Sequence, residues 1–292
     1  MTRRGGSASE ACNCEPQRQA AALDGNESSN SYRVSHQAPG YGSMYNETFE
    51  GGYYAALWQK IERPLVEDIL RPLGGPTRRC LDFACGTGRI ACVAAEYFRQ
   101  VVGVDVSPAM IQCASVAENV SLRIVDITRE DMHETFDVAT AFRFFLNAED
   151  ALKREALSAI RRHLRDGGYL VCNIHMNAAS PAGFLYRRGK AVFGERTQNT
   201  LGLEAFCAYL SEAGFVVEDV RYYGYLPRLG PLMTDLCEHL VEPAERLCRA
   251  LAVPGRFAQN FVVVARSLGR DARAAPFQVG FRRSVQSARA QR

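Results

Sequence analysis

The segment Cys80–Ile90, which reads Cys-Leu-Asp-Phe-Ala-Cys-Gly-Thr-Gly-Arg-Ile, constrains the fold of this chain more than any other. An apolar run at 79–83 has the character of a buried strand, two glycines follow at once, and residues 90–98 have helical character. Glycine lets main chain approach a ligand closely, and the first turn of a helix presents unpaired N–H groups. The segment therefore predicts a strand, a ligand-binding loop and a helix.

The glycine spacing alone is compatible with two kinds of cofactor. Gly86-x-Gly88-x-x-Ala91 satisfies the dinucleotide-binding pattern. Asp82, four residues before Gly86 and still on the strand, favours the other kind, because Leu-Asp-x-x-Cys-Gly-Thr-Gly resembles motif I of the class I S-adenosylmethionine (SAM) methyltransferases. The resemblance implies that Asp82 orders the loop and the amino group of the ligand, and that the glycines line its methionine part. Ala84 stands where many members of the family have a further glycine.

Two later strands are also expected to end in an acid. Asp105 closes an apolar run 17 residues beyond Gly88, where a carboxylate can accept hydrogen bonds from both ribose hydroxyls. Asp126 follows a third run, and the resemblance implies that it meets the adenine amino group while the main-chain N–H of Ile127 reaches the ring. Three acids in register with motif I strengthen the resemblance.

The predicted cofactor site gathers these strand ends and the helices beside them. In the family an apolar side chain packs against adenine, and Met110 stands at that position here. Similar enzymes also close N-terminal helices over SAM, and Tyr54 and Trp58 are the candidate residues for this contact. The full predicted set for SAM, and for its product S-adenosylhomocysteine (SAH), is Asp82, Ala84, Gly86, Gly88, Asp105, Val106, Met110, Asp126, Ile127, Phe142, Tyr54 and Trp58.

Further apolar runs at 136–142, 169–175, 215–223 and 260–266 alternate with helical patterns. This alternation predicts an α/β fold with a doubly wound, mostly parallel sheet and helices on both faces. The resemblance implies seven strands, the last of them antiparallel between the fifth and sixth.

The chain divides by composition into three parts. Residues 1–44 are predicted to be a disordered polar tail, residues 45–267 the SAM-dependent methyltransferase domain, and residues 268–292 a basic tail. Two long connections, at about 176–200 and 224–258, leave the carboxyl ends of strands and are expected to form a substrate cap.

The two connections differ in character. The first carries a basic group, which is either a solvated face or a site for phosphate or carboxylate: Arg187, Arg188, Lys190 and Arg196. The second carries leucines at helical spacing, which either pack on the core or form a lid or a dimer face: Leu232, Leu236, Leu240, Leu247 and Leu251.

Methyl transfer from SAM requires alignment of the acceptor and, for an oxygen acceptor, a base. The loop after the fourth strand lacks the Asp/Asn-Pro-Pro-Tyr signature of amide and adenine N-methyltransferases, which argues for a small molecule and against nucleic-acid bases. His175, after the fifth strand, is the candidate base, and Arg143 the candidate for gripping an acidic substrate group. A packed histidine and a surface arginine are the alternatives.

The composition fits one globular domain with loose ends: 292 residues, 47% hydrophobic, with a net charge of +3. No apolar run approaches the roughly 18 residues of a membrane span, and the basic N-terminus has no apolar core behind it. Cys12-x-Cys14 is the only close cysteine pair and lacks partners for zinc, so no metal is predicted. A reduced, cytoplasmic protein is expected.

Two other functions remain open. A nicotinamide-dependent reductase is compatible with the glycine spacing and with Tyr186-x-x-x-Lys190, although Asp82 has no role in such an enzyme. A SAM-fold protein that binds the cofactor without catalysis is the second alternative.

Overall fold

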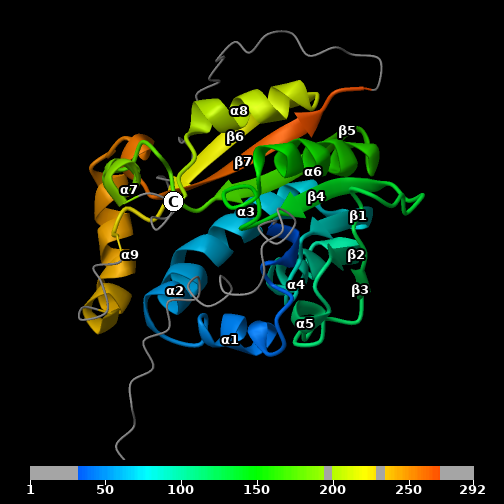
Figure 1. Cartoon of the computed structure of the whole chain (residues 1–292), viewed down its shortest axis with the longest axis horizontal. Coiled ribbons are helices and arrows are strands. Elements are labelled where there is room, and N and C mark those ends of the chain that lie inside the picture. The colour runs from blue at the N-terminus through cyan, green and yellow to red at the C-terminus, as the bar shows by residue number, and fades with distance from the viewer. Residues whose placement is uncertain (1–31, 194–198, 228–233, 270–292) are drawn as a thin grey trace, which may run out of the picture.

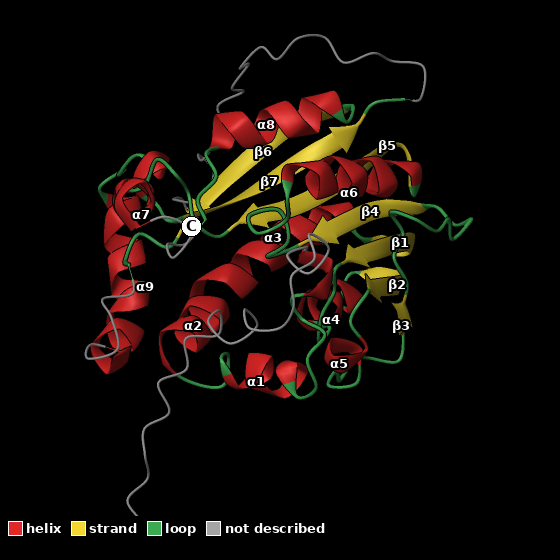
Figure 2. Ribbon diagram, in the orientation of Figure 1, coloured by secondary structure: helices red, strands yellow, loops and turns green. Residues whose placement is uncertain are grey.

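In the computed structural model, residues 32–193, 199–227 and 234–269 are described. They form one seven-stranded sheet flanked by helices (Figures 1 and 2). The strands are β1 (Gly75–Phe83), β2 (Phe98–Asp105), β3 (Val120–Ile124), β4 (Phe136–Ala141), β5 (Leu164–Ile174), β6 (Phe215–Tyr223) and β7 (Asn260–Ser267). The helices are α1 (Tyr41–Glu47), α2 (Gly52–Leu57), α3 (Arg63–Leu73), α4 (Arg89–Ala95), α5 (Pro108–Ile111), α6 (Asp150–Arg162), α7 (Pro181–Phe193), α8 (Leu203–Glu212) and α9 (Thr234–Ala250).

The strand order is β3-β2-β1-β4-β5-β7-β6. The pairs from β3 to β5 are parallel, whereas β7 runs antiparallel to both β5 and β6. The predicted doubly wound sheet, with its last strand antiparallel between the fifth and sixth, is therefore confirmed.

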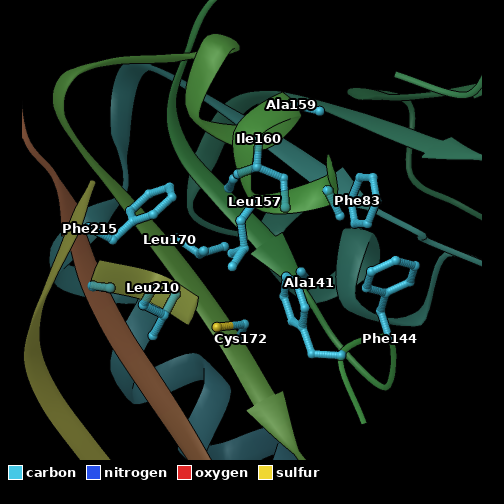
Figure 3. Close-up of a cluster of buried hydrophobic side chains, with 14 of the residues drawn as sticks. Phe83, Ala141, Phe144, Leu157, Ala159, Ile160, Leu170, Cys172, Leu210 and Phe215 are labelled. Atoms are coloured by element: carbon cyan, nitrogen blue, oxygen red, sulfur yellow. The ribbon is translucent and has the colours of Figure 1, made fainter. Parts of the chain in front are cut away.

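Each face of the sheet has its own apolar core. One core packs β4, β5 and β7 under α6 and α8, and Figure 3 shows Leu157 and Ile160 of α6 against Leu170 of β5. The other core holds the opposite face against the N-terminal helices and α4, with Val66, Leu70 and other fully buried side chains. Burial on both faces explains why the central strands read as continuous apolar runs.

A π-helical turn, Trp58–Glu62, joins α2 to α3. Such turns often occur at functional sites, because the extra residue redirects a side chain. Here the turn carries Glu62, whose exposure is 1%, into the interior.

Part of the segment predicted to be a disordered tail has regular structure. The described structure begins at Tyr32, and residues 32–44 include a short 3₁₀ turn, Tyr32–Val34, and the start of α1, so the expectation of disorder up to residue 44 is wrong for this part. The stretch is held by aromatic contacts of His36 with Tyr32 and Tyr41, which offset the entropy of ordering a polar segment. Residues 1–31, with Cys12 and Cys14, and the tail from residue 270 lie outside the described residues.

The two long connections carry helices α7 and α9, which Figure 1 shows on the same side of the molecule. Helix α9 packs on α2. Its inward face is formed by Cys237, Val241 and Glu245, whereas Leu247 and Leu251 are 59% and 68% exposed. Leu236 and Leu240 are exposed as well, so the leucines at helical spacing do not form the packed face.

Parts of the two connections cannot be compared with the sequence-based expectations. Arg187 and Arg188 lie exposed on α7. Arg196 and Leu232 lie outside the described residues, and the side chain of Lys190 is not described either. None of the helices in the described ranges combines the length and apolar character needed to cross a membrane.

Candidate functional site

The glycine loop after β1 has the backbone conformation that its sequence predicts. Gly86 and Gly88 have φ values of 55° and 81°, in the left-handed region that side chains disfavour. Ala84 also lies there, with φ of 53°, which explains why a glycine suits this position. A Cβ atom on Gly86 would lie 2.9 Å from Met110 Cε, so the loop and α5 are in close contact.

Asp105 fixes this loop from the neighbouring strand. Its Oδ2 accepts a hydrogen bond from the backbone N–H of Gly86 at 2.8 Å, and its Oδ1 accepts one from the N–H of Ser107 at 2.8 Å. Burial raises the pKa of Asp105, and these N–H donors oppose the shift by favouring the ionised form. Each carboxylate oxygen retains a lone pair for a further donor, which fits the predicted role toward ribose.

Asp82 lies at the carboxyl end of β1, and Asp105 lies at the carboxyl end of the neighbouring strand β2. Its Oδ1 accepts a 2.6 Å hydrogen bond from the Thr140 hydroxyl, whereas Oδ2 is buried without a hydrogen-bond partner. Burial raises the pKa of Asp82 to about 7, although the Thr140 hydroxyl and the nearby N–H of Ala91 favour the ionised form. A buried acceptor without a donor is what a site for a ligand's amino group requires.

Asp126 has a partner that the sequence did not indicate. Arg33, from the 3₁₀ turn, donates to Asp126 Oδ2 at 2.9 Å, and the Thr128 hydroxyl donates to Oδ1 at 2.6 Å. The same N-terminal stretch contacts the other strand ends, because Ser107 donates to the His36 carbonyl and Tyr32 to the Arg143 carbonyl. The N-terminal stretch thus lies across the carboxyl ends of the strands that are predicted to bind the nucleoside.

Arg89, the first residue of α4, is a site residue that the sequence analysis missed. Its guanidinium lies 3.7 Å from the centre of the Phe49 ring and 4.4 Å from that of Trp58. Nη2 donates to the Tyr45 hydroxyl at 3.3 Å, but Nε and Nη1 are buried without partners. Burial, with a smaller effect from the charge of Arg143, lowers the pKa of Arg89.

Arg143 lies two residues beyond the end of β4 and has a φ of 61°, a strained conformation for a residue with a side chain. Its backbone N–H donates to Asn173 Oδ1 at 2.7 Å, which holds the turn to β5. Its Nη2 lies 3.4 Å from Glu62 Oε2, its Nε is buried without a partner, and its guanidinium lies 5.1 Å from the Phe49 ring centre. Burial has the largest single effect on the pKa of Arg143 and lowers it, but Glu62 and the nearby Tyr45, Tyr223 and Tyr54 together outweigh burial and raise the pKa.

Glu62 joins the arginine to the far strands. Its Oε1 accepts hydrogen bonds from the Tyr223 hydroxyl at 2.8 Å and from Asn173 Nδ2 at 3.1 Å. Burial raises the pKa of Tyr223, and the negative charge of Glu62 adds to the shift, so the phenol stays protonated and donates. One carboxylate is therefore shared among one cation and two neutral donors.

His175, after β5, has a buried Nδ1 without a partner. Burial, with smaller effects from the charges of Arg143 and Arg89, lowers its pKa to about 3. The imidazole is therefore neutral at physiological pH and, with this pKa, a weak proton acceptor.

The remaining predicted residues fall into two groups. Tyr54 and Trp58 lie beside Phe49 and Arg89, close to the arginines, and Met110 is buried against the glycine loop. The side chains of Ile127 and Phe142 are buried in the apolar cores, which leaves their main chain for a ligand. Val106 follows Asp105 at the same strand end.

Glu62, Arg89, Asn173 and Tyr223 were not predicted because no sequence motif distinguishes them, and the contacts of Glu62 with Asn173 and Tyr223 depend on the strand order. For Arg89 the signal was its place directly after the glycine loop, where a side chain can return to the ligand.

Comparisons with known proteins agree with this architecture. Residues 80–168 match the family model described as a methyltransferase domain. The probable S-adenosylmethionine-dependent methyltransferase CRG1 of Saccharomyces cerevisiae is 30% identical over 95 residues, which are 31% of this chain and 33% of that one. The ubiquinone biosynthesis O-methyltransferase of Cereibacter sphaeroides is 30% identical over 123 residues, 40% of this chain and 49% of that protein. The chain thus spans a third to a half of the length of these relatives.

Solved structures share the fold at low sequence identity. The N-methyltransferase NodS from Bradyrhizobium japonicum, crystallised with SAH, has a TM-score of 0.51 and 15% identity, over 77% of this chain and 97% of that chain. The [4+2]-cyclase SpnF has a TM-score of 0.51 and 20% identity, over 76% and 85%. The protein has the class I methyltransferase fold, and its resemblance to the SAM-dependent methyltransferases is confirmed.

The shifted pKa of Asp82 leads to a prediction about stability. A carboxyl group whose pKa rises from 3.8 unfolded to about 7 folded binds more protons in the folded state, so the free energy of unfolding falls as pH rises from about 4 to about 7. Asp82→Asn keeps an acceptor for Thr140 but cannot titrate. We therefore expect the free energy of unfolding of the variant to fall by a few kcal/mol less over this pH range than that of the wild type. Urea unfolding of both proteins across this range measures the difference. Parallel curves for the two proteins would contradict the prediction.

Proposed function

We propose that this protein is a SAM-dependent methyltransferase that acts on a small-molecule acceptor. The observation that carries the proposal is the strained glycine loop fixed by Asp105, next to the buried, unpartnered carboxylate oxygen of Asp82. The methyltransferase-domain match spans this loop, and the sheet order supports the same function. Because a [4+2]-cyclase also has this fold, the fold alone does not define the reaction.

The residues present suit SAM. Asp82 offers a buried acceptor to an ammonium group, Asp105 offers carboxylate lone pairs to hydroxyls, and the loop at Gly86 and Gly88 has no side chains to hinder close approach. Val106, Met110 and the main chain at Ile127 would complete the nucleoside side, with Asp126 released from Arg33. SAM, when bound, supplies an activated methyl group on a sulfonium.

The chain's own residues would orient the acceptor and manage its proton. His175 is neutral and its Nδ1 lacks a partner. An anion held by Arg143 and Arg89 would offset the two charges that lower the pKa of His175, which would raise the pKa toward that of a base able to take a proton from an oxygen or nitrogen acceptor. Phe49, Tyr54 and Trp58 surround the arginines and would exclude water. Helices α7 and α9 would form the substrate cap, the outer face of α9 remaining a candidate for a dimer. The cytoplasmic location stays a prediction.

Calorimetric titration of the purified chain with SAM, SAH and NADPH tests the proposal. We expect micromolar binding of SAM and SAH, and methyl transfer from labelled SAM to members of a small-molecule panel. Binding of NADPH alone would overturn the proposal and support the reductase alternative through Tyr186 and Lys190. Binding of SAM with no transfer to any acceptor would instead support the catalytically silent alternative.

A further inference from the structure

Arg89 and Arg143 form an unusual pair of partly buried cations. Both guanidinium groups lie near the ring of Phe49, at 3.7 Å and 5.1 Å from its centre. Three of their nitrogen atoms, Arg89 Nε, Arg89 Nη1 and Arg143 Nε, are buried without hydrogen-bond partners. A buried N–H without an acceptor costs free energy, so such groups indicate a ligand that is bound in the working protein.

The charges around Phe49 do not balance. The two arginines contribute a formal charge of +2, and Glu62, the acid that contacts Arg143, contributes −1. Glu62 is also occupied by Tyr223 and Asn173, and its contact with Arg143 is long, at 3.4 Å. The cluster formed by these three charged residues therefore lacks one negative charge. Asp82 also interacts with the charge of Arg89 but does not supply a full negative charge, because burial raises its pKa to about 7. A carboxylate supplies one, whereas a phosphate monoester carries about −1.5 to −2 at pH 7 and would leave an excess.

The position of Arg143 favours the methyl acceptor over the cofactor, whereas Arg89 directly follows the glycine loop predicted to line the methionine part of SAM. The acids predicted to take the nucleoside, Asp105 and Asp126, follow β2 and β3 on one side of β1. Arg143 and His175 follow β4 and β5, on the other side of β1, and the charges of both arginines act on His175. An oxyanion held by the arginines would thus lie next to the candidate base.

We propose that Arg143 and Arg89 bind a carboxylate of the methyl acceptor, so that the acceptor is an anionic small molecule. This inference rests on the proposed function. A guanidinium matches the planar carboxylate in geometry, and the resulting charge-assisted hydrogen bonds are about twice as strong as neutral ones. The ring of Phe49 beneath both guanidinium groups keeps the two cations in place through cation–π contacts.

The test compares carboxylates with isosteric amides. Benzoate, hydrocinnamate and decanoate, each with its amide, are titrated into the SAH-bound protein up to millimolar concentrations. We expect at least one acid to bind and its amide to bind at least about tenfold more weakly. Arg143→Gln should lose about tenfold or more in affinity for the acid while its affinity for SAH stays within about twofold. Arg154→Gln, on an exposed arginine of α6, is the matched control and should change neither.

A second arm identifies the source of the carboxylate. The same acids are titrated into protein bound to 5′-methylthioadenosine, which lacks the amino-acid part of SAH. Binding to both complexes supports an acceptor site. Binding to the methylthioadenosine complex alone would show that the arginines hold the carboxylate of the cofactor and would overturn the proposal.

Two further results would also overturn the proposal: no acid binds the SAH complex, or Arg143→Gln binds the acid as well as the wild type does. Arg143→Lys keeps the charge of a folded site but removes the planar fork, and we expect an intermediate affinity. The titration of SAH alone is made first, and failure of SAH to bind in it would count against the proposed function.

Discussion

Asp105→Ala is expected to abolish detectable SAM binding and, with it, methyl transfer. The carboxylate accepts hydrogen bonds from the N–H groups of Gly86 and Ser107, both at 2.8 Å. In the proposed function its remaining lone pairs bind the ribose hydroxyls. The substitution removes the ribose acceptors and also leaves two backbone donors at the loop without their partner. Loss of several hydrogen bonds to a charged group, at about 1.5–3 kcal/mol each, corresponds to a decrease of at least about a hundredfold in affinity. Calorimetry with SAH measures it.

The control for Asp105→Ala is an aspartate at the amino ends of the parallel strands, opposite the predicted cofactor site. Asp137, near the start of β4, likewise accepts a hydrogen bond from a backbone N–H, that of Arg79 at 2.8 Å, and also pairs with Arg165. Asp137→Ala should lower stability without changing SAH affinity. If both variants bind SAH like the wild type, the strand-end acids do not form the cofactor site.

The order of elements could be predicted because it follows from local pattern. Apolar runs alternate with helical stretches, glycines follow the first strand, and each of the first three predicted strands ends in an acid. The sequence therefore predicts which strand ends are candidates for the cofactor site. Asp82 and Asp105 meet at these strand ends because β1 and β2 are parallel neighbours, with Asp82 opposite Gly103.

The acceptor side could be predicted only in part. His175 and Arg143 were chosen for their places after strands, but Glu62 and Tyr223 are separated by 161 residues and meet only because β7 inserts beside β5 and the N-terminal turn packs on the sheet. Likewise, the pairing of Arg33 with Asp126 depends on an aromatic cluster in a segment whose polar composition predicts disorder. The local sequence pattern contains no information on such long-range tertiary contacts.

Glu62→Ala is expected to cause a large loss of stability, because Glu62 is the carboxylate that faces two buried cations. Removing one member of a buried ion pair leaves an uncompensated charge, at a cost of about 3–5 kcal/mol. Tyr223 and Asn173 would lose their acceptor as well. Urea unfolding measures the free energy of unfolding. Glu67→Ala is the control, since Glu67 pairs with Arg63 near the surface, where a salt bridge contributes about 1 kcal/mol or less.

A second substitution separates the effect of charge from the effect of lost packing. If the uncompensated charge of Arg143 dominates, Glu62→Ala combined with Arg143→Met should be more stable than Glu62→Ala alone, because the cation is removed together with its partner. If lost packing dominates, the double variant should be less stable than either single variant. Benzoate should stabilise Glu62→Ala more than it stabilises the wild type, since the cluster around Phe49 then lacks two negative charges instead of one. Equal stabilisation of the two proteins would mean that Glu62 does not set the charge of the arginine site.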